Sequence, residues 1–338
     1  MSGIDSPERP AFRAGYRFYR WSDALRRRPV WTDVWYPARE GADEEPISYS
    51  LGVGAVARDA ELAAPGPAFP LVVLSHGASG SATNYAWLAE YLARSGSVVL
   101  GVSHYGESWR YGPDSVDPSA ATRLWTRPHD CTFALTELLR HPAFERSVDA
   151  TRVAALGHSS GGATAFALGG AVFDPAALAD YCRSESARND RGCQYGRERQ
   201  ELPPAPPEAT QSYRDGRVRA IVALDPAAGP GYSDAALAEV RMPVLVIGCE
   251  HNDFLPFEHH AKRYAALLPD VTLLKLDGPE GHFVFLNSCG SDLSANGVSL
   301  CVDREGVDRE AVHARLAPRI RAFLAAALGR GGGKFEAC

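Results

Sequence analysis

The chain has 338 residues, of which 45% are hydrophobic and 22% are charged, a composition typical of a soluble globular protein with a sizeable core. Its formal net charge of −6 argues against a surface built to bind nucleic-acid phosphates, which requires clustered Lys and Arg side chains. The length favours one large domain with insertions over two domains. We therefore expect a small molecule, and not nucleic acid, as the binding partner.

No stretch of about 18 uninterrupted apolar residues, the length needed to cross a membrane, occurs in the sequence. Residues 1–19 also lack the apolar run of a signal peptide. The sequence therefore predicts a cytoplasmic protein without a membrane span, and it gives no indication of an oligomeric state.

Four of the seven cysteines flank two polar segments, with Cys182 and Cys193 around one and Cys289 and Cys301 around the other. These spacings would suit two local disulfides in an oxidising compartment. Because no export signal supports such a compartment, the sequence favours free thiols. No CxxC pair or Cys/His group has the spacing of a structural zinc site.

Short β-type runs alternate with helical patterns through most of the chain, which predicts an α/β protein with a mostly parallel sheet covered by helices. The aromatic and valine-rich runs 16–21 and 30–36 suggest an antiparallel edge of that sheet. The other expected strands are 71–75, 98–102, 153–156, 218–224, 244–247 and 272–276. The expected helices are 85–96, 131–139, 163–171, 258–268 and a C-terminal helix over 312–327 that Pro318 should kink or split.

Two segments interrupt this alternation. Residues 40–67, rich in Gly, Pro, Ala and acidic side chains, suggest a surface connection. Residues 174–216 are polar and proline-rich, so we expect an insertion or partial lid between the helix 163–171 and the following strand. One domain should cover residues 1–330, with a flexible tail over 331–338.

The central motif is Gly157-x-Ser159-x-Gly161, placed where an expected strand turns sharply into an expected helix. Glycines on either side of the serine allow strand and helix to approach closely, and the strained turn presents the hydroxyl at the carboxyl edge of the sheet. A glycine-rich packing turn could have the same pattern. The strand before it, the helix after it and a suitable downstream histidine favour a nucleophile elbow with Ser159 as the nucleophile.

A serine hydroxyl needs a base to take its proton, and ten histidines are present. His282 follows the last expected strand, in a loop that can reach over the sheet edge, so it is the predicted general base. His158 and His76 are expected to be structural. A metal site near His251 and the adjacent pair at 259–260 is disfavoured, because neighbouring histidines on a helix diverge.

The tetrahedral intermediate of acyl transfer carries a negative oxygen that needs hydrogen-bond donors already in place. The backbone N–H of Ser160, which follows the nucleophile, is one candidate. The N–H of Ala78, after His76-Gly77, is the other. A glycine-rich connection without this role is the alternative interpretation of the second segment.

Several motifs in the correct order give the chain a resemblance to known families. They are Val34-Trp35-Tyr36-Pro37, Ser75-His76-Gly77, Arg127-Pro128-x-Asp130, the elbow around Ser159, Leu224-Asp225-Pro226, Asp253 and Gly281-His282-Phe283. The chain resembles bacterial α/β-hydrolases termed predicted dienelactone hydrolases and, more distantly, platelet-activating-factor acetylhydrolases and chlorophyllases. The resemblance implies the α/β-hydrolase fold and ester hydrolysis through an acyl-enzyme, without a metal or organic cofactor. Dienelactone hydrolases proper use a cysteine nucleophile, so the serine at position 159 removes the implication of dienelactone chemistry.

Two aspartates could orient His282, because each follows one of two consecutive expected strands. Asp253 occupies the position used by most α/β-hydrolases, whereas Asp225 matches the position of the acid in platelet-activating-factor acetylhydrolases and chlorophyllases. The chain order Ser, Asp, His suits both. The sequence favours Asp253, with Asp225 as the alternative acid.

These residues together predict a carboxylic-ester hydrolase that acts on a small-molecule ester. An acyltransferase or peptidase with the same triad, and a non-catalytic binding protein on the same fold, are the alternative functions. The segments 104–126, 174–216 and 287–308 should border the pocket. The aromatic side chains of Tyr105, Trp109, Tyr111 and Trp125 suggest an apolar or aromatic substrate group, although ordinary loop packing would also explain them.

Overall fold

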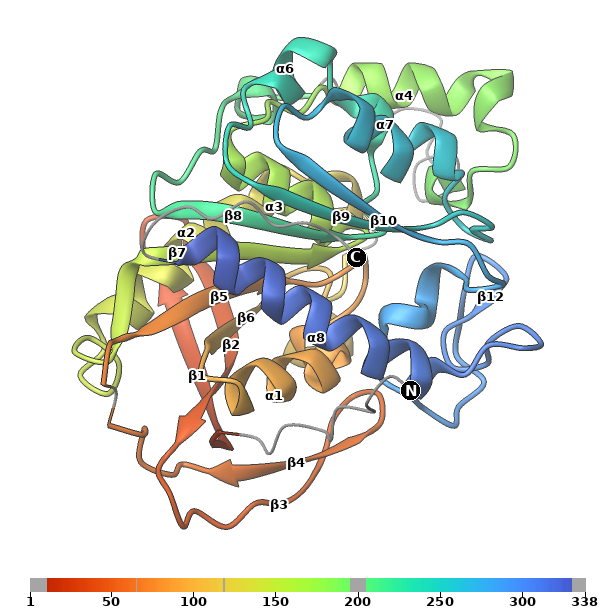
Figure 1. Cartoon of the computed structure of the whole chain (residues 1–338). Helices are drawn as coiled ribbons and strands as arrows, with labels where there is room; N and C mark the ends of the chain where they lie inside the picture. Colours follow the sequence, from red (N-terminus) through yellow and green to blue (C-terminus); the bar gives the residue numbers. More distant parts are fainter. Residues whose placement is uncertain (1–10, 65, 118, 195–204, 330–338) are drawn as a thin grey trace.

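A ten-stranded sheet forms the centre of the computed structural model, which describes residues 11–64, 66–117, 119–194 and 205–329 (Figure 1). The strand order is β10-β9-β8-β7-β5-β6-β2-β1-β4-β3. Neighbours from β10 to β6 are parallel, whereas β2 is antiparallel to both β6 and β1. The strands are β1 (Arg13–Asp23), β2 (Arg28–Ala38), β3 (Glu45–Ser48), β4 (Val53–Arg58), β5 (Phe69–Ser75), β6 (Val98–Ser103), β7 (Val148–His158), β8 (Val218–Leu224), β9 (Val244–Cys249) and β10 (Val271–Leu276). This arrangement is the α/β-hydrolase fold expected from the sequence.

Helices cover both faces of the sheet (Figure 1). Helices α1 and α8 pack together on one face, and α2, α3 and α7 lie on the other. The α-helices are α1 (Ala86–Arg94), α2 (Thr126–Arg140), α3 (Ser160–Gly169), α4 (Pro175–Arg183), α6 (Asp234–Ala238), α7 (Ala261–Leu267) and α8 (Arg309–Leu328). Because both faces are covered, the central strands contain continuous apolar runs, such as 71–74 in β5 and 220–224 in β8, instead of alternating apolar and polar residues.

The central strand β5 shows how the two cores are built. Leu71 and Val73 point into the core beneath α2 and α3, while Val72 and Leu74 point into the core beneath α1 and α8. All four side chains are at most 2% exposed. Successive residues of a strand point to opposite faces, so one short apolar run supplies both cores and fixes the carboxyl end of β5 within the sheet.

The expected antiparallel edge is confirmed, since β1 and β2 pair from Arg13 opposite Ala38 to Asp23 opposite Arg28. The prediction of a surface connection over residues 40–67 is wrong, because this segment contains β3 and β4. Strand β4 pairs with β1 and extends the sheet beyond the predicted edge. The Gly and Ala residues that suggested a loop occur in a short strand at the sheet margin, where β-propensity is a weak guide.

The expected C-terminal helix is present as α8, and it continues through Pro318 without a break. Its apolar side, which includes Leu316, Ile320 and Phe323, is buried against the sheet and α1. This burial offsets the hydrogen bond that proline removes from the helix. The predicted tail over 331–338 lies outside the described residues.

Two disulfides join the cysteine pairs that the sequence favoured as free thiols, and that preference was wrong. Cys182 is bonded to Cys193, and Cys289 is bonded to Cys301. Each bond closes a local loop that lies beside the pocket described below. Among the described residues, Cys131 and Cys249 are free and buried.

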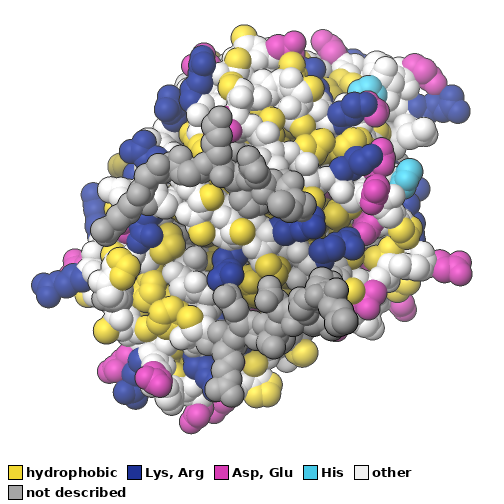
Figure 2. Space-filling view, viewed as in Figure 1, with side chains coloured by type: hydrophobic (Ala, Val, Ile, Leu, Met, Phe, Trp, Pro, Cys, Tyr) yellow, Lys and Arg dark blue, Asp and Glu magenta, His cyan; other side chains and the backbone are white. Residues whose placement is uncertain are grey.

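The described part of the surface in Figure 2 carries mixed charge, because Lys and Arg side chains are interspersed with Asp and Glu side chains. None of the helices in the described ranges has both the length and the apolar character required to pass through a bilayer.

We predict that peptide mapping of the unreduced protein by mass spectrometry will recover the two local pairs, Cys182 with Cys193 and Cys289 with Cys301. Burial raises the pKa of both free thiols, Cys131 and Cys249, and a protonated buried thiol reacts slowly. These two should therefore be alkylated only after denaturation. Alkylation of all four paired cysteines in the native, unreduced protein would contradict the assignment.

Candidate functional site

Ser159 lies in the sharp turn between β7 and α3, as the motif predicts. Its backbone has φ 57° and ψ −123°, a conformation that residues with a side chain rarely adopt. Such strain persists only where the surrounding structure enforces it, and it is typical of functional sites. The turn therefore has the geometry of a nucleophile elbow.

The surrounding glycines are required by close packing. A Cβ atom on Gly157 would lie 2.1 Å from the carbonyl oxygen of Gly161, and one on Gly161 would lie 1.9 Å from the carbonyl oxygen of Ser75. Both distances are far below van der Waals contact. The two glycines of the motif thus allow α3 to begin directly against the ends of β5 and β7.

The elbow is hydrogen-bonded to the loop that follows the neighbouring strand β8. The Ser159 N–H donates to the carbonyl oxygen of Leu224 over 3.0 Å, and the Ala227 N–H donates to the carbonyl oxygen of Ser159, also over 3.0 Å. Asp225 lies between these two attachment points. The position of this aspartate is therefore fixed relative to Ser159 by backbone hydrogen bonds.

The side chain of Asp225 contacts the ring of His282. One oxygen of Asp225, Oδ2, pairs with Nδ1 of His282, and the two side chains are 2% and 1% exposed. Oδ2 also accepts from the amide of Asn252, and Oδ1 accepts from the N–H of Cys249 over 3.3 Å. With the proton of the neutral imidazole held on Nδ1 by the carboxylate, Nε2 has a free lone pair.

Asp253, the acid favoured by the sequence, does not contact the imidazole ring. Its Oδ1 accepts from the backbone N–H of His282 over 2.9 Å, and its side chain is 24% exposed. A Cβ atom on Gly281 would lie 2.5 Å from Oδ2 of Asp253, so the carboxylate packs against the backbone of the histidine loop. The structure thus brings the alternative acid, Asp225, to the ring, and it places Asp253 where it holds the loop.

The ring of His282 also stacks on an aromatic side chain. Phe254 lies parallel to it, with ring centroids 5.0 Å apart and an interplanar angle of 9°. Stacking on one side and the carboxylate at Nδ1 together restrict the rotation of the imidazole.

His158 is structural, as expected, and it connects two parts of the site. Its Nε2 lies 2.9 Å from the carbonyl oxygen of His282, so this nitrogen donates, and Nδ1 accepts from the hydroxyl of Tyr85 over 2.9 Å. The same hydroxyl accepts from the N–H of Gly77 over 3.0 Å. Burial holds the pKa of His158 well below its usual range, so the ring remains neutral. This series of hydrogen bonds joins the loop after β5 to the loop that carries the candidate base.

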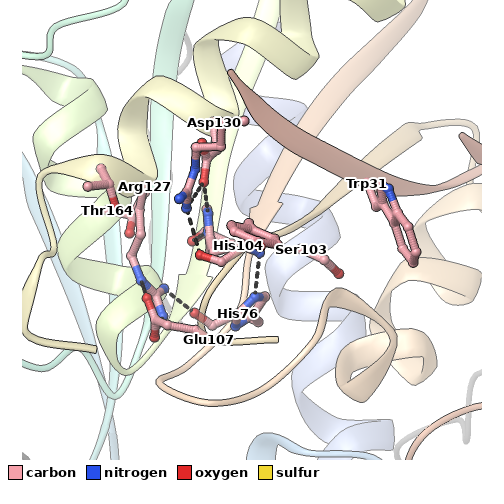
Figure 3. Close-up of polar contacts among 12 residues, drawn as sticks. Trp31, His76, Ser103, His104, Glu107, Arg127, Asp130 and Thr164 are labelled. Carbon is pink, nitrogen blue, oxygen red and sulfur yellow. Dashed lines mark hydrogen bonds and ion pairs between the residues drawn. The ribbon is translucent and has the colours of Figure 1, made fainter. Parts of the chain in front are cut away.

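The loop after β5, which contains Ala78, is also held by a buried arginine (Figure 3). Arg127 donates to the carbonyl oxygen of His76 over 2.6 Å and to that of Gly77 over 3.4 Å. Its guanidinium pairs with both oxygens of Glu107. Burial alone would raise the pKa of Glu107, but the adjacent Arg127 lowers it, so the pair is charged.

A second series of buried hydrogen bonds, through His76, His104 and Asp130, supports the same loop (Figure 3). The backbone N–H of His104 donates to Nε2 of His76 over 3.0 Å, and the ring nitrogen Nδ1 of His104 lies 3.0 Å from a carboxylate oxygen of Asp130. Although burial would raise the pKa of Asp130, hydrogen bonds from His104 and from Arg28 lower it. His76 is therefore structural, as expected, and its ring is fixed by a buried charged cluster.

A cavity of about 2110 Å³ contains these candidate groups. Ser159, Ser160, His282 and Ala78 all line it. Ser160 is the first residue of α3, and the N–H groups in the first turn of a helix have no partner within that helix. The serine, the histidine and both proposed oxyanion donors thus belong to one cavity, which is about twice the volume of an ordinary ligand pocket.

The three segments expected at the pocket all contribute to its wall. Trp109 and Trp125 line the cavity, as do parts of the regions 174–216 and 287–308. The other two aromatic residues pack elsewhere. The hydroxyl of Tyr111 donates to the carbonyl oxygen of Ser103 over 2.7 Å, and Tyr105 lies edge-on against Tyr111. Ordinary loop packing therefore explains that second pair.

One of the histidines considered as metal ligands, His260, is paired with a buried carboxylate. Nε2 of His260 lies 2.7 Å from a carboxylate oxygen of Asp190, which is buried. Within the described ranges, no three His, Cys, Asp or Glu side chains are grouped so that they could hold a metal ion.

Three residues that shape the site were not assigned this role from the sequence. Tyr85 was assigned only to a helical pattern, Asn252 was not singled out, and Arg127 entered only as part of a motif. The sequence does not show that Arg127 is buried, so it gave no sign that this arginine needs a partner such as Glu107. The long-range partners of Tyr85 and Asn252 had no local signal.

Comparisons with known proteins agree with this fold. Residues 47–125 match the family described as platelet-activating factor acetylhydrolase, isoform II. A solved structure of a ferulic acid esterase from Streptomyces cinnamoneus is similar, with a TM-score of 0.62 and 23% identity over 98% of this chain and 94% of that chain. No curated protein is significantly similar to the chain. The chain therefore has the α/β-hydrolase fold and, over residues 47–125, resembles the platelet-activating-factor acetylhydrolases.

Proposed function

We propose that the protein is a serine esterase in which Ser159, His282 and Asp225 form the catalytic triad. The observation that carries this proposal is the pairing of Asp225 with Nδ1 of His282, together with the fact that His282 lines the same cavity as Ser159 in its strained turn. The resemblance to acetylhydrolases and the esterase with a similar fold support the same reaction class.

In the proposed mechanism, Oγ of Ser159 bonds to the ester carbonyl carbon while Nε2 of His282 takes the hydroxyl proton. The carbon–oxygen bond to the alcohol then breaks, and the histidine returns the proton to the leaving alkoxide. Water attacks the acyl-enzyme in the same way and releases the carboxylic acid. Asp225 keeps the imidazole in the required tautomer and stabilises the imidazolium that forms in each step.

We further propose that the N–H groups of Ala78 and Ser160 bind the oxyanion. Arg127 donates to the two carbonyl groups that precede the first donor, those of His76 and Gly77, and the Tyr85 hydroxyl accepts from the N–H of Gly77. A donor fixed in this way needs little reorganisation when negative charge develops on the substrate.

The substrate that fits best is an ester with a bulky apolar substituent. The cavity has room for more than an acetyl group, and Trp109, Trp125, Phe254 and Phe283 supply apolar wall. The ferulic acid esterase with the similar fold acts, by its name, on an ester of an aromatic acid. We also propose an oxidising working compartment, because structural disulfides are rare in the cytosol.

The Ser159→Ala variant should lose ester hydrolysis by several orders of magnitude while unfolding at the same temperature as the wild type, because the triad loses its nucleophile. The measurement is turnover of p-nitrophenyl esters of increasing acyl length, with labelling by a fluorophosphonate probe alongside. His282→Ala should be comparably impaired, and the double variant should be no worse than either single variant. Wild-type turnover by Ser159→Ala would refute the proposal.

Replacement of the two aspartates by asparagine should separate their roles. Asp225→Asn should lower kcat by about ten-thousand-fold, the effect known for loss of the orienting carboxylate in serine proteases. Asp253→Asn keeps an oxygen that can accept from the N–H of His282, so it should retain most of the activity. The two variants should be measured on one ester at neutral pH, and the reverse order of activities would reinstate Asp253 as the acid.

Arg127→Met should lower kcat by about a hundredfold, because the loop that carries Ala78 loses its support and small displacements of catalytic groups are costly. It should also lower the free energy of unfolding by about 3–5 kcal/mol, because Glu107 becomes an unpaired buried charge. Adding Glu107→Gln should recover stability but not kcat. Full recovery of both by the double variant would show that Arg127 acts only on stability.

A further inference from the structure

Two loops at the rim of the cavity are each closed by a disulfide. The first rim loop, residues 182–193, is closed by Cys182–Cys193, and the second rim loop, residues 289–301, is closed by Cys289–Cys301. Both loops supply wall to the cavity that contains Ser159. A disulfide across so short a loop removes conformations from the chain, so each wall segment is held in shape before substrate arrives.

A reciprocal pair of hydrogen bonds joins the two rim loops. Nη1 of Arg191 donates to the carbonyl oxygen of Asn296 over 2.5 Å, and the side-chain amide of Asn296 donates to the carbonyl oxygen of Arg191 over 3.0 Å. We call this pair the clasp. It connects segments 105 residues apart in the sequence.

The second rim loop is shaped to present this contact. Asn296 and Gly297 have φ values of 47° and 78° and form the turn between the short strands β11 (Ser294–Ala295) and β12 (Val298–Ser299). Asn-Gly is the preferred dipeptide for a two-residue hairpin turn that needs positive φ at both positions. A two-stranded hairpin of this length is not stable alone. The clasp supports it together with the Cys289–Cys301 disulfide and Arg309, which donates to the carbonyl oxygen of Leu300 over 2.8 Å.

The first rim loop is anchored to the catalytic side of the cavity. The N–H of Arg191 donates to the carbonyl oxygen of Phe254 over 2.9 Å, and the ring of Phe254 stacks on His282. The preceding residue, Asp190, is buried and paired with His260. The clasp therefore extends a fixed structure from the histidine loop to the rim.

The wall that the clasp fixes is largely apolar. From the second rim loop, Leu293, Ala295 and Leu300 line the cavity, and the Cys182–Cys193 disulfide lines it from the first. Leu293 is 51% exposed even though it is a large apolar side chain. An apolar surface kept open to a cavity gains free energy when an apolar ligand group covers it.

We propose that the clasp, Arg191 with Asn296, is a specificity determinant that holds an apolar wall against the bulky substituent of the ester. This inference rests on the proposed esterase function. A fixed wall contacts a long or aromatic substituent but does not reach an acetyl group, so loosening it should lower the preference for large esters.

The test compares the kcat/KM ratio of long to short esters in clasp variants. One pair, p-nitrophenyl octanoate and p-nitrophenyl acetate, varies the acyl group, and a second pair, octyl acetate and ethyl acetate, varies the alcohol. Arg191→Ala removes the guanidinium. Asn296→Gly removes the amide and keeps a residue that tolerates positive φ. Arg188→Ala is the matched control, because Arg188 lies in the same rim loop, is exposed and, within the described ranges, forms an ion pair only with Glu185.

Both clasp variants should lower the long-to-short ratio by about tenfold in at least one pair, mainly through KM, which is the effect of losing contact with about two methylene groups. Arg188→Ala should leave the ratio unchanged. Wild-type protein treated with dithiothreitol, which converts each disulfide to two thiols, should shift in the same direction, with its thermal unfolding recorded to confirm that it stays folded.

Ratios within twofold of the wild type in both clasp variants and both pairs would overturn the inference while leaving the esterase function intact. Failure of the wild type to hydrolyse any of the four esters, or undiminished hydrolysis by Ser159→Ala, would instead overturn the proposed function.

Discussion

The backbone hydrogen bonds between the elbow and the loop after β8 are the constraint on which the rest of the site depends. Because the N–H of Ser159 is bonded to Leu224, and the N–H of Ala227 to Ser159, the residue between them cannot move independently of the nucleophile. Parallel neighbouring strands bring their carboxyl ends to one edge, so β7 and β8 deliver a hydroxyl and a carboxylate side by side. The histidine loop then needs to satisfy only one geometric requirement, which is that its ring reach that carboxylate.

Buried charge makes the opposite side of the site rigid. The side chains of Arg127, Glu107, His104 and Asp130 lie in the interior, behind the loop that contains Ala78. Removing such charges from water is costly, and the cost is offset only when every group is well paired. The cluster therefore tolerates few alternative arrangements. That property suits the oxyanion role proposed for the N–H of Ala78, because apolar packing alone would permit small shifts of the loop.

Local patterns in the sequence predicted much of the fold and of the site. The elbow, the order of the central strands along the chain and the position of His282 follow from glycine spacing and apolar runs. Strands β3 and β4 at the sheet margin could not be predicted in this way, because short exposed strands have little hydrophobic patterning. Local sequence patterns also could not decide between Asp225 and Asp253 as the partner of the His282 ring. The choice depends on a long-range contact, because the backbone N–H of His282 donates to Asp253. The prediction of free thiols was also wrong, because the compartment was inferred from the absence of an export signal in the sequence.

The two aspartates that follow β8 and β9 have different contacts with His282. Asp253 follows the strand where the acid commonly lies, yet it is bonded to the N–H of His282 and is partly exposed. Asp225 is buried, accepts from Asn252 and Cys249, and pairs with the ring. These contacts hold the Asp225 carboxylate in one orientation against the ring, whereas the Asp253 carboxylate is held against the backbone of the histidine loop. For the proposed triad, Asp225 is thus the better placed of the two carboxylates, and Asp253 fixes the loop that carries His282.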